Sequence, residues 1–165
     1  MQPAAGAPTP EASDHVQLVL PPPVIFLGHL LSALVLQWIV PLPIPAPWSL
    51  PARILGGLLL LGGLVIAGAA VREMRRLHTS PDPHQAVAAL VISGPYRFSR
   101  NPIYLGMLLI FLGFTLLAAT LWGLLIGPFL IRAVVRSIIR AEEAYLQGRF
   151  KEQYSLYRSL VRRWI

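Results

Sequence analysis

The 165-residue sequence contains no cysteine and carries little charge. The absence of cysteine excludes disulfides, thiol nucleophiles, zinc–thiolate sites, iron–sulfur clusters and covalent haem attachment. Only 13% of the residues are charged, whereas soluble domains usually carry about 25%. Hydrophobic residues make up 55% of the chain, and its mean hydropathy is +0.62. Because a small globule exposes most of its residues, this composition indicates an integral membrane protein.

Three apolar stretches are long enough to cross a bilayer, which takes about 20 residues of helix. The third runs uncharged from about residue 103 to 131, and its length fits either one long tilted helix or a tight hairpin. A hairpin would place thirteen of the fourteen Lys and Arg residues on one side of the membrane, with only Arg53 on the other. The positive-inside rule therefore favours the hairpin.

The sequence thus predicts an all-α polytopic membrane protein with four transmembrane helices, at about 24–40, 54–71, 103–118 and 121–135. Both termini and the polar loop 72–102 are expected on the cytoplasmic side of the cytoplasmic membrane. The net charge of +7 is then explained by topology and anionic membrane lipids, so no nucleic-acid partner is predicted.

The polar segments have distinct expected roles. Residues 1–23 form a Pro-rich tail that is predicted to be disordered, and residues 24–165 form a single domain. Residues 136–160 are typical of an amphipathic helix on the membrane surface. Arg162, Arg163 and Trp164 have the chemistry of a headgroup anchor. The glycines of the apolar spans are expected to serve helix packing.

The spans hold no Asp, Glu, Lys or Arg before Arg132, which disfavours a proton-coupled transporter. His29 is the single histidine at membrane depth, so haem ligation by two histidines is disfavoured and a packing role is expected. No metal site is predicted. Any functional site is therefore expected in the polar loop and the C-terminal helix.

Two polar clusters stand out there. The first is Gly-Pro-Tyr-Arg-Phe-Ser-Arg-Asn-Pro-Ile-Tyr-Leu-Gly at residues 94–106, in which Asn101 and Pro102 suit the N-cap and first position of a helix. Helix-start amides flanked by Arg97 and Arg100 also form a potential anion site. The second is the Glu142–Glu143 pair, which on an exposed helix would be ordinary solvated residues.

Residues 78–165 resemble the isoprenylcysteine carboxyl methyltransferase and phospholipid methyltransferase families. Those families carry G-x-Y-x-x-x-R-H-P-x-Y-x-G, which is matched by residues 94–106, then an E-E pair and F-x-x-x-Y-x-x-Y, matched by Phe150, Tyr154 and Tyr157. The resemblance implies S-adenosylmethionine as methyl donor and a lipid-soluble acceptor, either an isoprenylcysteine carboxylate or a phospholipid amine.

The resemblance also implies site residues. Glu142 would hold the donor's ammonium or ribose hydroxyls, and aromatic rings would tolerate its sulfonium. Arg140, Asn101 and Tyr104 are the expected catalytic residues. The expected donor-binding residues are Ala88, Ala89, Leu90, Val91, Tyr96, Arg100, Asn101, Pro102, Ile103, Tyr104, Glu142 and Glu143.

The sequence departs from the family at Asn101, where histidine is usual. An amide cannot accept a proton at neutral pH, so Asn101 cannot be a general base. A carboxylate acceptor needs no base but needs an arginine; counting back from Glu142 leads to Ile138, and of the flanking arginines we choose Arg140 over Arg136. An amine acceptor would need another base, and His78 and His84 have no motif support.

Two alternatives remain open at this stage. One is a membrane reductase of the steroid reductase type that uses NADPH, because its C-terminal architecture is similar. The other is a membrane interaction protein without enzymatic activity, in which the motif residues would serve packing alone.

Overall fold

Helices make up most of the chain in the computed structural model, which describes residues 20–80 and 89–165. A short 3-10 turn, η1 (Gly94–Arg97), precedes α3, and a π-helical segment, η2 (Val135–Ile139), joins α4 to α5 without interruption. The α-helices are α1 (Pro22–Ile39), α2 (Ala46–Arg76), α3 (Pro102–Leu117), α4 (Trp122–Val134) and α5 (Arg140–Leu160).

The helices have the length and surface of membrane spans. α1, α2 and the continuous helix Trp122–Leu160 are long and apolar enough to cross a membrane, and α3 is a shorter apolar helix. Large hydrophobic side chains are exposed on them, including Trp38, Val65 and Phe129 at 86%, 69% and 68%. Such exposure is typical of helices whose outer faces contact lipid. The predicted all-α polytopic membrane fold is therefore confirmed.

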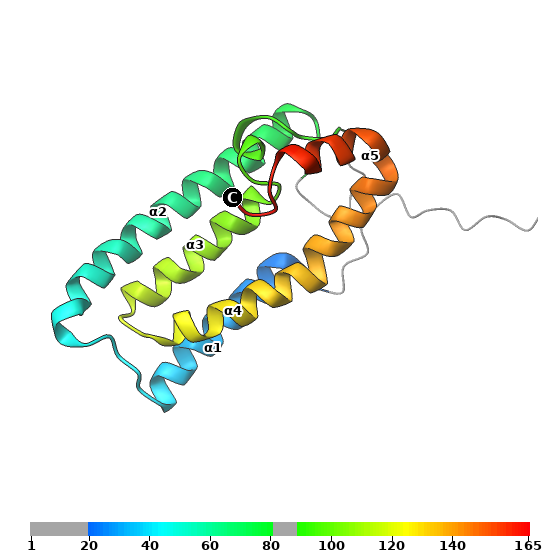
Figure 1. Ribbon diagram of the computed structural model, residues 1–165. Coiled ribbons are helices and arrows are strands. Elements are labelled where there is room, and N and C mark those ends of the chain that lie inside the picture. The colour runs from blue at the N-terminus through cyan, green and yellow to red at the C-terminus, as the bar shows by residue number, and fades with distance from the viewer. Residues whose placement is uncertain (1–19, 81–88) are drawn as a thin grey trace, which may run out of the picture.

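The apolar block 103–131 folds as a hairpin, because α3 ends at Leu117 and α4 begins at Trp122. The intervening turn binds the link between α1 and α2: the Ile44 amide donates to the Ala119 carbonyl at 2.8 Å, and the Leu121 amide donates to the Leu42 carbonyl at 3.0 Å. Both links therefore lie at the same end of the bundle (Figure 1).

Two helices differ from the ranges expected from hydropathy. α2 begins at Ala46 and continues to Arg76, beyond the expected 54–71 at both ends. The expected helix 136–160 is divided into η2 and α5, and α5 has a kink at Lys151, where φ is 43°. Hydropathy identifies the apolar part of a helix that contacts lipid. The helix itself can extend beyond that part into polar sequence, because backbone hydrogen bonds do not depend on hydropathy.

Close contact between α2 and α3 depends on glycine. A Cβ atom built on Gly63 would lie 2.5 Å from the Gly106 carbonyl oxygen, and one on Gly56 would lie 2.8 Å from the Gly113 carbonyl oxygen. These distances are too short for any side chain, so the two backbones touch directly. By contrast, a Cβ on Gly62 would meet nothing within 4 Å.

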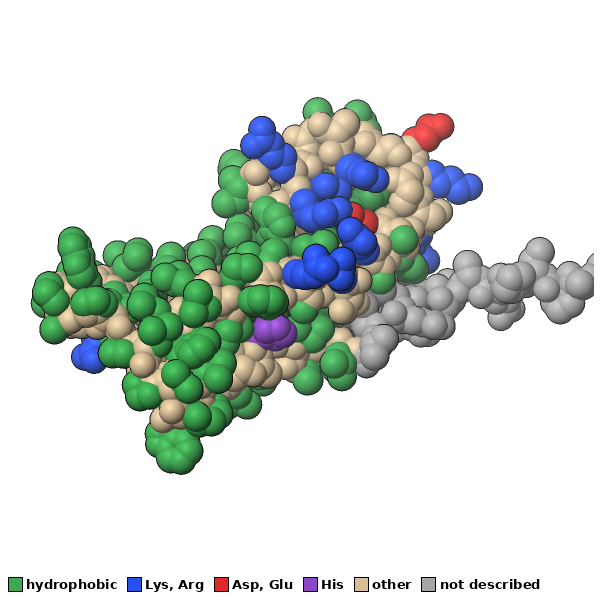
Figure 2. All heavy atoms as spheres, turned by 60° about the horizontal axis from the view of Figure 1, so that its bottom comes forward, with side chains coloured by type: hydrophobic (Ala, Val, Ile, Leu, Met, Phe, Trp, Pro, Cys, Tyr) green, Lys and Arg blue, Asp and Glu red, His purple; other side chains and the backbone are tan. Residues whose placement is uncertain are grey.

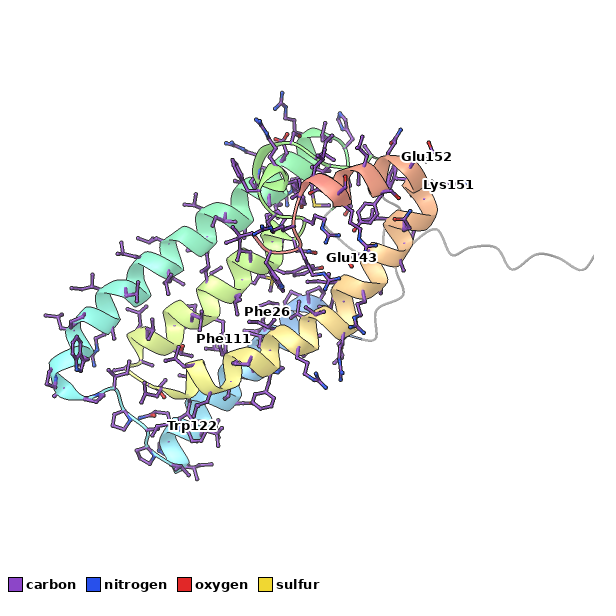
Figure 3. The ribbon with its side chains drawn as sticks, viewed as in Figure 1. Phe26, Phe111, Trp122, Glu143, Lys151 and Glu152 are labelled. Carbon is purple, nitrogen blue, oxygen red and sulfur yellow. The ribbon has the colours of Figure 1, made fainter. Side chains whose placement is uncertain are left out.

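α1 and α4 pack as a second pair beside α2 and α3 (Figure 1). The core between the helices includes Phe26 from α1, Phe111 from α3, and Leu130 and Val134 from α4 (Figure 3 labels the two phenylalanines). Beyond the kink, α5 turns back across the end of the bundle that is remote from the two links (Figure 1). This arrangement brings α5 to the end of α2 and the start of α3 and creates the site described below.

The glycine contact gives a testable prediction. Gly63→Ala should lower the stability of the bundle by about 1–3 kcal/mol, because the added methyl group forces α2 and α3 apart. Gly62→Ala is the matched control and should be neutral or slightly stabilising, since its methyl group enters open space and alanine favours helix. Thermal unfolding in detergent measures both. Equal melting temperatures for the two variants would contradict the packing argument.

Candidate active site

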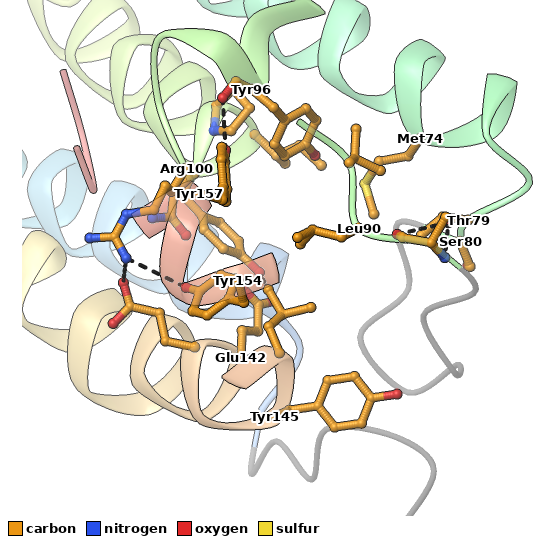
Figure 4. A pocket seen from close by; sticks show the side chains of 18 residues that line it. Met74, Thr79, Ser80, Leu90, Tyr96, Arg100, Glu142, Tyr145, Tyr154 and Tyr157 are labelled. Carbon is orange, nitrogen blue, oxygen red and sulfur yellow. Dashed lines mark hydrogen bonds and ion pairs between the residues drawn. The ribbon is translucent and has the colours of Figure 1, made fainter. Parts of the chain in front are cut away.

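A pocket lies at the polar end of the bundle, between the end of α2, the start of α3 and the two halves of α5 (Figure 4). Segments distant in the sequence meet there because α5 folds back over the bundle. Its lining residues are Met74, Thr79, Ser80, Ala89, Leu90, Val91, Tyr96, Arg100, Asn101, Pro102, Ile103, Tyr104, Glu142, Glu143, Tyr145, Leu146, Tyr154 and Tyr157.

Most residues expected to bind the donor are brought together in this pocket. All of them line it except Ala88, which lies outside the described residues. Of the expected catalytic residues, Asn101 and Tyr104 line the pocket. Arg140 is exposed and lies outside the pocket lining. Arg140 precedes Glu142 by two positions, which is about 200° around a helix, so the two side chains point in opposite directions.

Glu142 faces the pocket and is bound by Tyr104. The Tyr104 hydroxyl donates to Glu142 Oε1 at 2.5 Å, joining α5 to the first turn of α3. No Lys or Arg of the described residues forms an ion pair with Glu142. Burial raises the pKa of Glu142 to about 7; the Tyr104 hydrogen bond opposes this shift, and the neighbouring Glu143 charge adds to it.

Glu143 lies beside Glu142 but has a different environment. Arg163 donates to both of its oxygens, at 3.0 and 2.7 Å, and Arg100 Nη1 lies 3.1 Å from Oε1. Burial alone would raise the pKa of Glu143, but the bonds from Arg163 and the charges of Arg163, Arg100 and Arg158 lower it overall. The charge of Glu143 is therefore balanced by arginines of the protein, whereas Glu142 has no ion-pair partner among the described residues.

The C-terminal segment forms part of the site. The Asn101 side-chain amide donates to the Arg163 carbonyl at 2.9 Å, and the Arg100 backbone amide donates to the Arg162 carbonyl at 3.0 Å. Asn101 stands at the N-cap position of α3 and Pro102 begins the helix, as the sequence predicts, but the Asn101 side chain makes no cap bond and binds Arg163 instead. The headgroup-anchor prediction is wrong for Arg163 and Trp164, because Arg163 pairs with Glu143 and Trp164 packs against the core.

Tyrosine rings form one wall of the pocket. The Tyr157 hydroxyl donates to the Tyr96 carbonyl at 2.7 Å, and the Tyr154 and Tyr157 rings lie 6.3 Å apart (Figure 4). Burial, with smaller effects of neighbouring groups, raises the pKa of Tyr96 and of Tyr157, so both hydroxyls remain protonated. Phe150, which precedes them in the motif, does not line the pocket.

Sequence reasoning missed the contribution of the end of α2 and of the segment after it. Met74, Thr79 and Ser80 line the pocket, and Thr79 Oγ1 accepts a hydrogen bond from the Ala89 amide at 3.1 Å. Glu73 receives a 2.5 Å hydrogen bond from the Ser93 hydroxyl. No motif marks these residues, because their proximity to η1 arises from chain folding.

Other candidates from the sequence lie elsewhere. Arg97 is exposed and Arg100 is bound to Glu143, so the expected anion site is not formed by these two arginines. His78 is exposed and outside the pocket lining, and His84 lies outside the described residues. His29 Nδ1 lies 2.7 Å from the Ile25 carbonyl oxygen of its own helix, far along the chain from the pocket residues.

The fold and the pocket together define a polytopic membrane protein with an acidic and aromatic pocket at the polar end of its bundle. The phospholipid methyltransferase family matches residues 51–153, and the chain belongs to this family. It is accordingly a membrane methyltransferase, and the family points to membrane lipids as its substrates. Comparison with curated proteins and with solved structures found no match. The family predicted from the motifs is thereby confirmed.

The ion pairs of Glu143 lead to a prediction about the C-terminal segment. Arg163→Ala should destabilise the protein by about 3 kcal/mol, because it leaves Glu143 in a largely buried position with Arg100 alone. Arg162→Ala is the control, since that side chain is exposed and only its carbonyl is used. Thermal unfolding of both variants in the same detergent provides the comparison. Similar stability of the two variants would mean that Glu143 does not need Arg163.

Proposed function

We propose that the protein transfers a methyl group from S-adenosylmethionine to a phospholipid amine at the polar boundary of the membrane. The supporting observation is Glu142, a carboxylate that faces the pocket, is oriented by Tyr104 and has no ion-pair partner among the described residues. S-adenosylmethionine carries an ammonium and a sulfonium group. A carboxylate and aromatic rings are the groups that favour such cations.

The charge of the pocket also favours this donor over NADPH. Dinucleotide phosphates are favoured by cationic side chains as well as by helix-start amides. Among the described lining residues Arg100 is the one basic side chain, and it lies within 3.1 Å of Glu143 and 3.5 Å of the Tyr154 hydroxyl. A pocket with two carboxylates and one engaged arginine suits a cationic donor better than the reductase alternative.

Each part of the pocket has a role in this proposal. Glu142 binds the donor's ammonium, and the free backbone amides of the first turn of α3 favour its carboxylate. Tyr96 and Tyr157 cover the sulfonium and exclude water. When bound, the donor supplies an activated methyl group. The residues of the chain then act by alignment and desolvation, which are the main demands of an in-line methyl transfer.

The positions of the arginines favour an amine over a carboxylate as the methyl acceptor. A carboxylate acceptor of the isoprenylcysteine type would need an arginine in the pocket, but Arg140 is exposed outside it and Arg100 is bound to Glu143. An amine nitrogen forms its bond to the methyl carbon as the carbon–sulfur bond breaks, with the electron pair left on sulfur and a proton lost from nitrogen. We assign that proton to water, because Asn101 cannot accept it and Glu142 is assigned to the donor's ammonium.

Donor binding tests the proposal directly. Purified protein in nanodiscs should bind S-adenosylmethionine saturably, and Glu142→Gln should weaken binding by about tenfold or more, because it removes a charge-assisted hydrogen bond. Glu152→Gln is the matched control on the same helix, where Glu152 is exposed and outside the pocket. Isothermal titration calorimetry, with NADPH titrated in parallel, measures these affinities.

Binding of NADPH alone would refute the donor assignment, and binding that Glu142→Gln leaves unchanged would refute the role of Glu142. The acceptor is tested by transfer of a labelled methyl group in nanodiscs containing phosphatidylethanolamine or, separately, a lipidated cysteine carboxylate. We expect label on the phosphatidylethanolamine. Label on the carboxylate alone would overturn the amine assignment.

The ionisation of Glu142 predicts a dependence of stability on pH. Because its pKa rises from 4.5 to about 7 on folding, the folded protein binds an extra proton between these values, and this stabilisation is lost as pH rises through about 7. The loss is about 3 kcal/mol at most. Glu142→Gln should abolish this part of the pH dependence and be more stable than wild type at pH 8. Thermal unfolding between pH 5 and 8, without donor, compares the two; parallel profiles would contradict the raised pKa.

A further inference from the structure

The helix formed by α4, η2 and the start of α5 has two opposite faces. Leu130, Val134 and Ile138 are fully buried in the core. Arg132, Arg136 and Arg140 each follow one of them by two positions, which is about 200° of helix rotation. All three arginines are exposed. The arginines therefore form a row on the outer face, directly opposite the row that packs into the bundle.

The row persists through the π-helical segment. A spacing of four residues returns a side chain to within about 40° of its predecessor, whether the turn is α-helical or the wider π turn. The row spans about 12 Å along the helix axis at 1.5 Å per residue. One headgroup layer of a bilayer is about 5–8 Å thick. Because arginine side chains are long and can bend toward this layer, all three guanidinium groups can reach it.

The three guanidinium groups have no protein partner among the described residues. The ion pairs between described residues use Glu73 and Glu143, and neither carboxylate contacts this row. The sequence has no Asp or Glu between Asp82 and Glu142, and Glu143, one turn after Arg140, is paired with Arg100 and Arg163. Three positive charges on one exposed face are complementary to phosphate groups.

Apolar side chains continue the row toward the other end of α4. Phe129 and Leu125, three and seven residues before Arg132, are 68% and 51% exposed. One face of the helix thus changes from apolar to basic along its length. Figure 2 shows hydrophobic side chains covering most of one side of the molecule, with Lys and Arg gathered toward one end. A ligand that matches both parts has an acyl chain and an anionic head.

We propose that this face of α4, η2 and α5 is a binding site for an anionic phospholipid, whose phosphate contacts Arg132, Arg136 and Arg140 and whose acyl chain lies along Phe129 and Leu125. The site is on the opposite side of the helix from the pocket that Glu142 lines, so it binds a lipid that is separate from the methyl acceptor. It does not depend on the proposed function. It would anchor α5, and with it Glu142 and Glu143, at the level of the headgroups.

Lipid binding by purified protein tests the site. In nanodiscs of phosphatidylcholine with increasing phosphatidylglycerol, the melting temperature of the wild type should rise with the anionic fraction. The double variant Arg132→Gln/Arg136→Gln should lose most of this rise, with about a fivefold weaker apparent affinity for phosphatidylglycerol for each arginine removed. Arg53→Gln is the control, because Arg53 is exposed near the start of α2, at the end of the bundle remote from α5.

Several results would overturn the proposal. One is a double variant whose melting temperature rises with phosphatidylglycerol as much as that of the wild type. This comparison requires that the two proteins melt at the same temperature in pure phosphatidylcholine. Another is an equal loss in Arg53→Gln, which would indicate a general effect of net charge. Inorganic phosphate and glycerol phosphate are tested as further ligands. If either one stabilises the protein as much as phosphatidylglycerol does, the site binds phosphate without specificity for lipid. We expect neither to stabilise the protein.

Discussion

The Glu143 carboxylate, held between Arg163 and Arg100, is the interaction on which the pocket depends. It joins α5, the segment just before α3 and the C-terminal segment at one point. Charges in so buried a place are tolerated only when each finds a partner with good geometry. Both arginines pair with Glu143, and neither forms an ion pair with Glu142. The pocket therefore has a carboxylate available for a cationic ligand.

The position of that carboxylate relies on the packing of the membrane helices. The backbones of α2 and α3 touch at Gly63 and Gly106, which lies two residues after Tyr104. This contact holds the end of α2 against η1 and the start of α3, where Tyr104 donates to Glu142. Glycine in a lipid-embedded helix sacrifices helix propensity for close approach. The apolar half of the molecule thus aligns groups that act in its polar half.

The family and much of the pocket could be predicted because they depend on local spacing. Gly94 to Gly106 lie within a few turns of each other, so Tyr96, Asn101 and Tyr104 meet in nearly any fold that starts a helix at Pro102. Arg140 lies outside the pocket lining, which a count along the chain cannot foresee because it carries no information on helix phase relative to the bundle. The environment of the C-terminal segment is unpredictable for a related reason: basic and aromatic residues suit either a headgroup layer or a packed ion pair and core, and only their neighbours in the fold distinguish these.

The sequence by itself determined that the protein lies in a membrane, is helical, turns back between α3 and α4, and carries the motifs of its family, since hydropathy, charge distribution and short spacings are properties of the chain alone. Tertiary structure decided which carboxylate is neutralised, which glycines touch, and that Asn101 holds the C-terminal segment. These depend on contacts across 20 to more than 60 residues, such as the 62 residues between Asn101 and Arg163. Only the folded chain brings such partners within hydrogen-bonding distance.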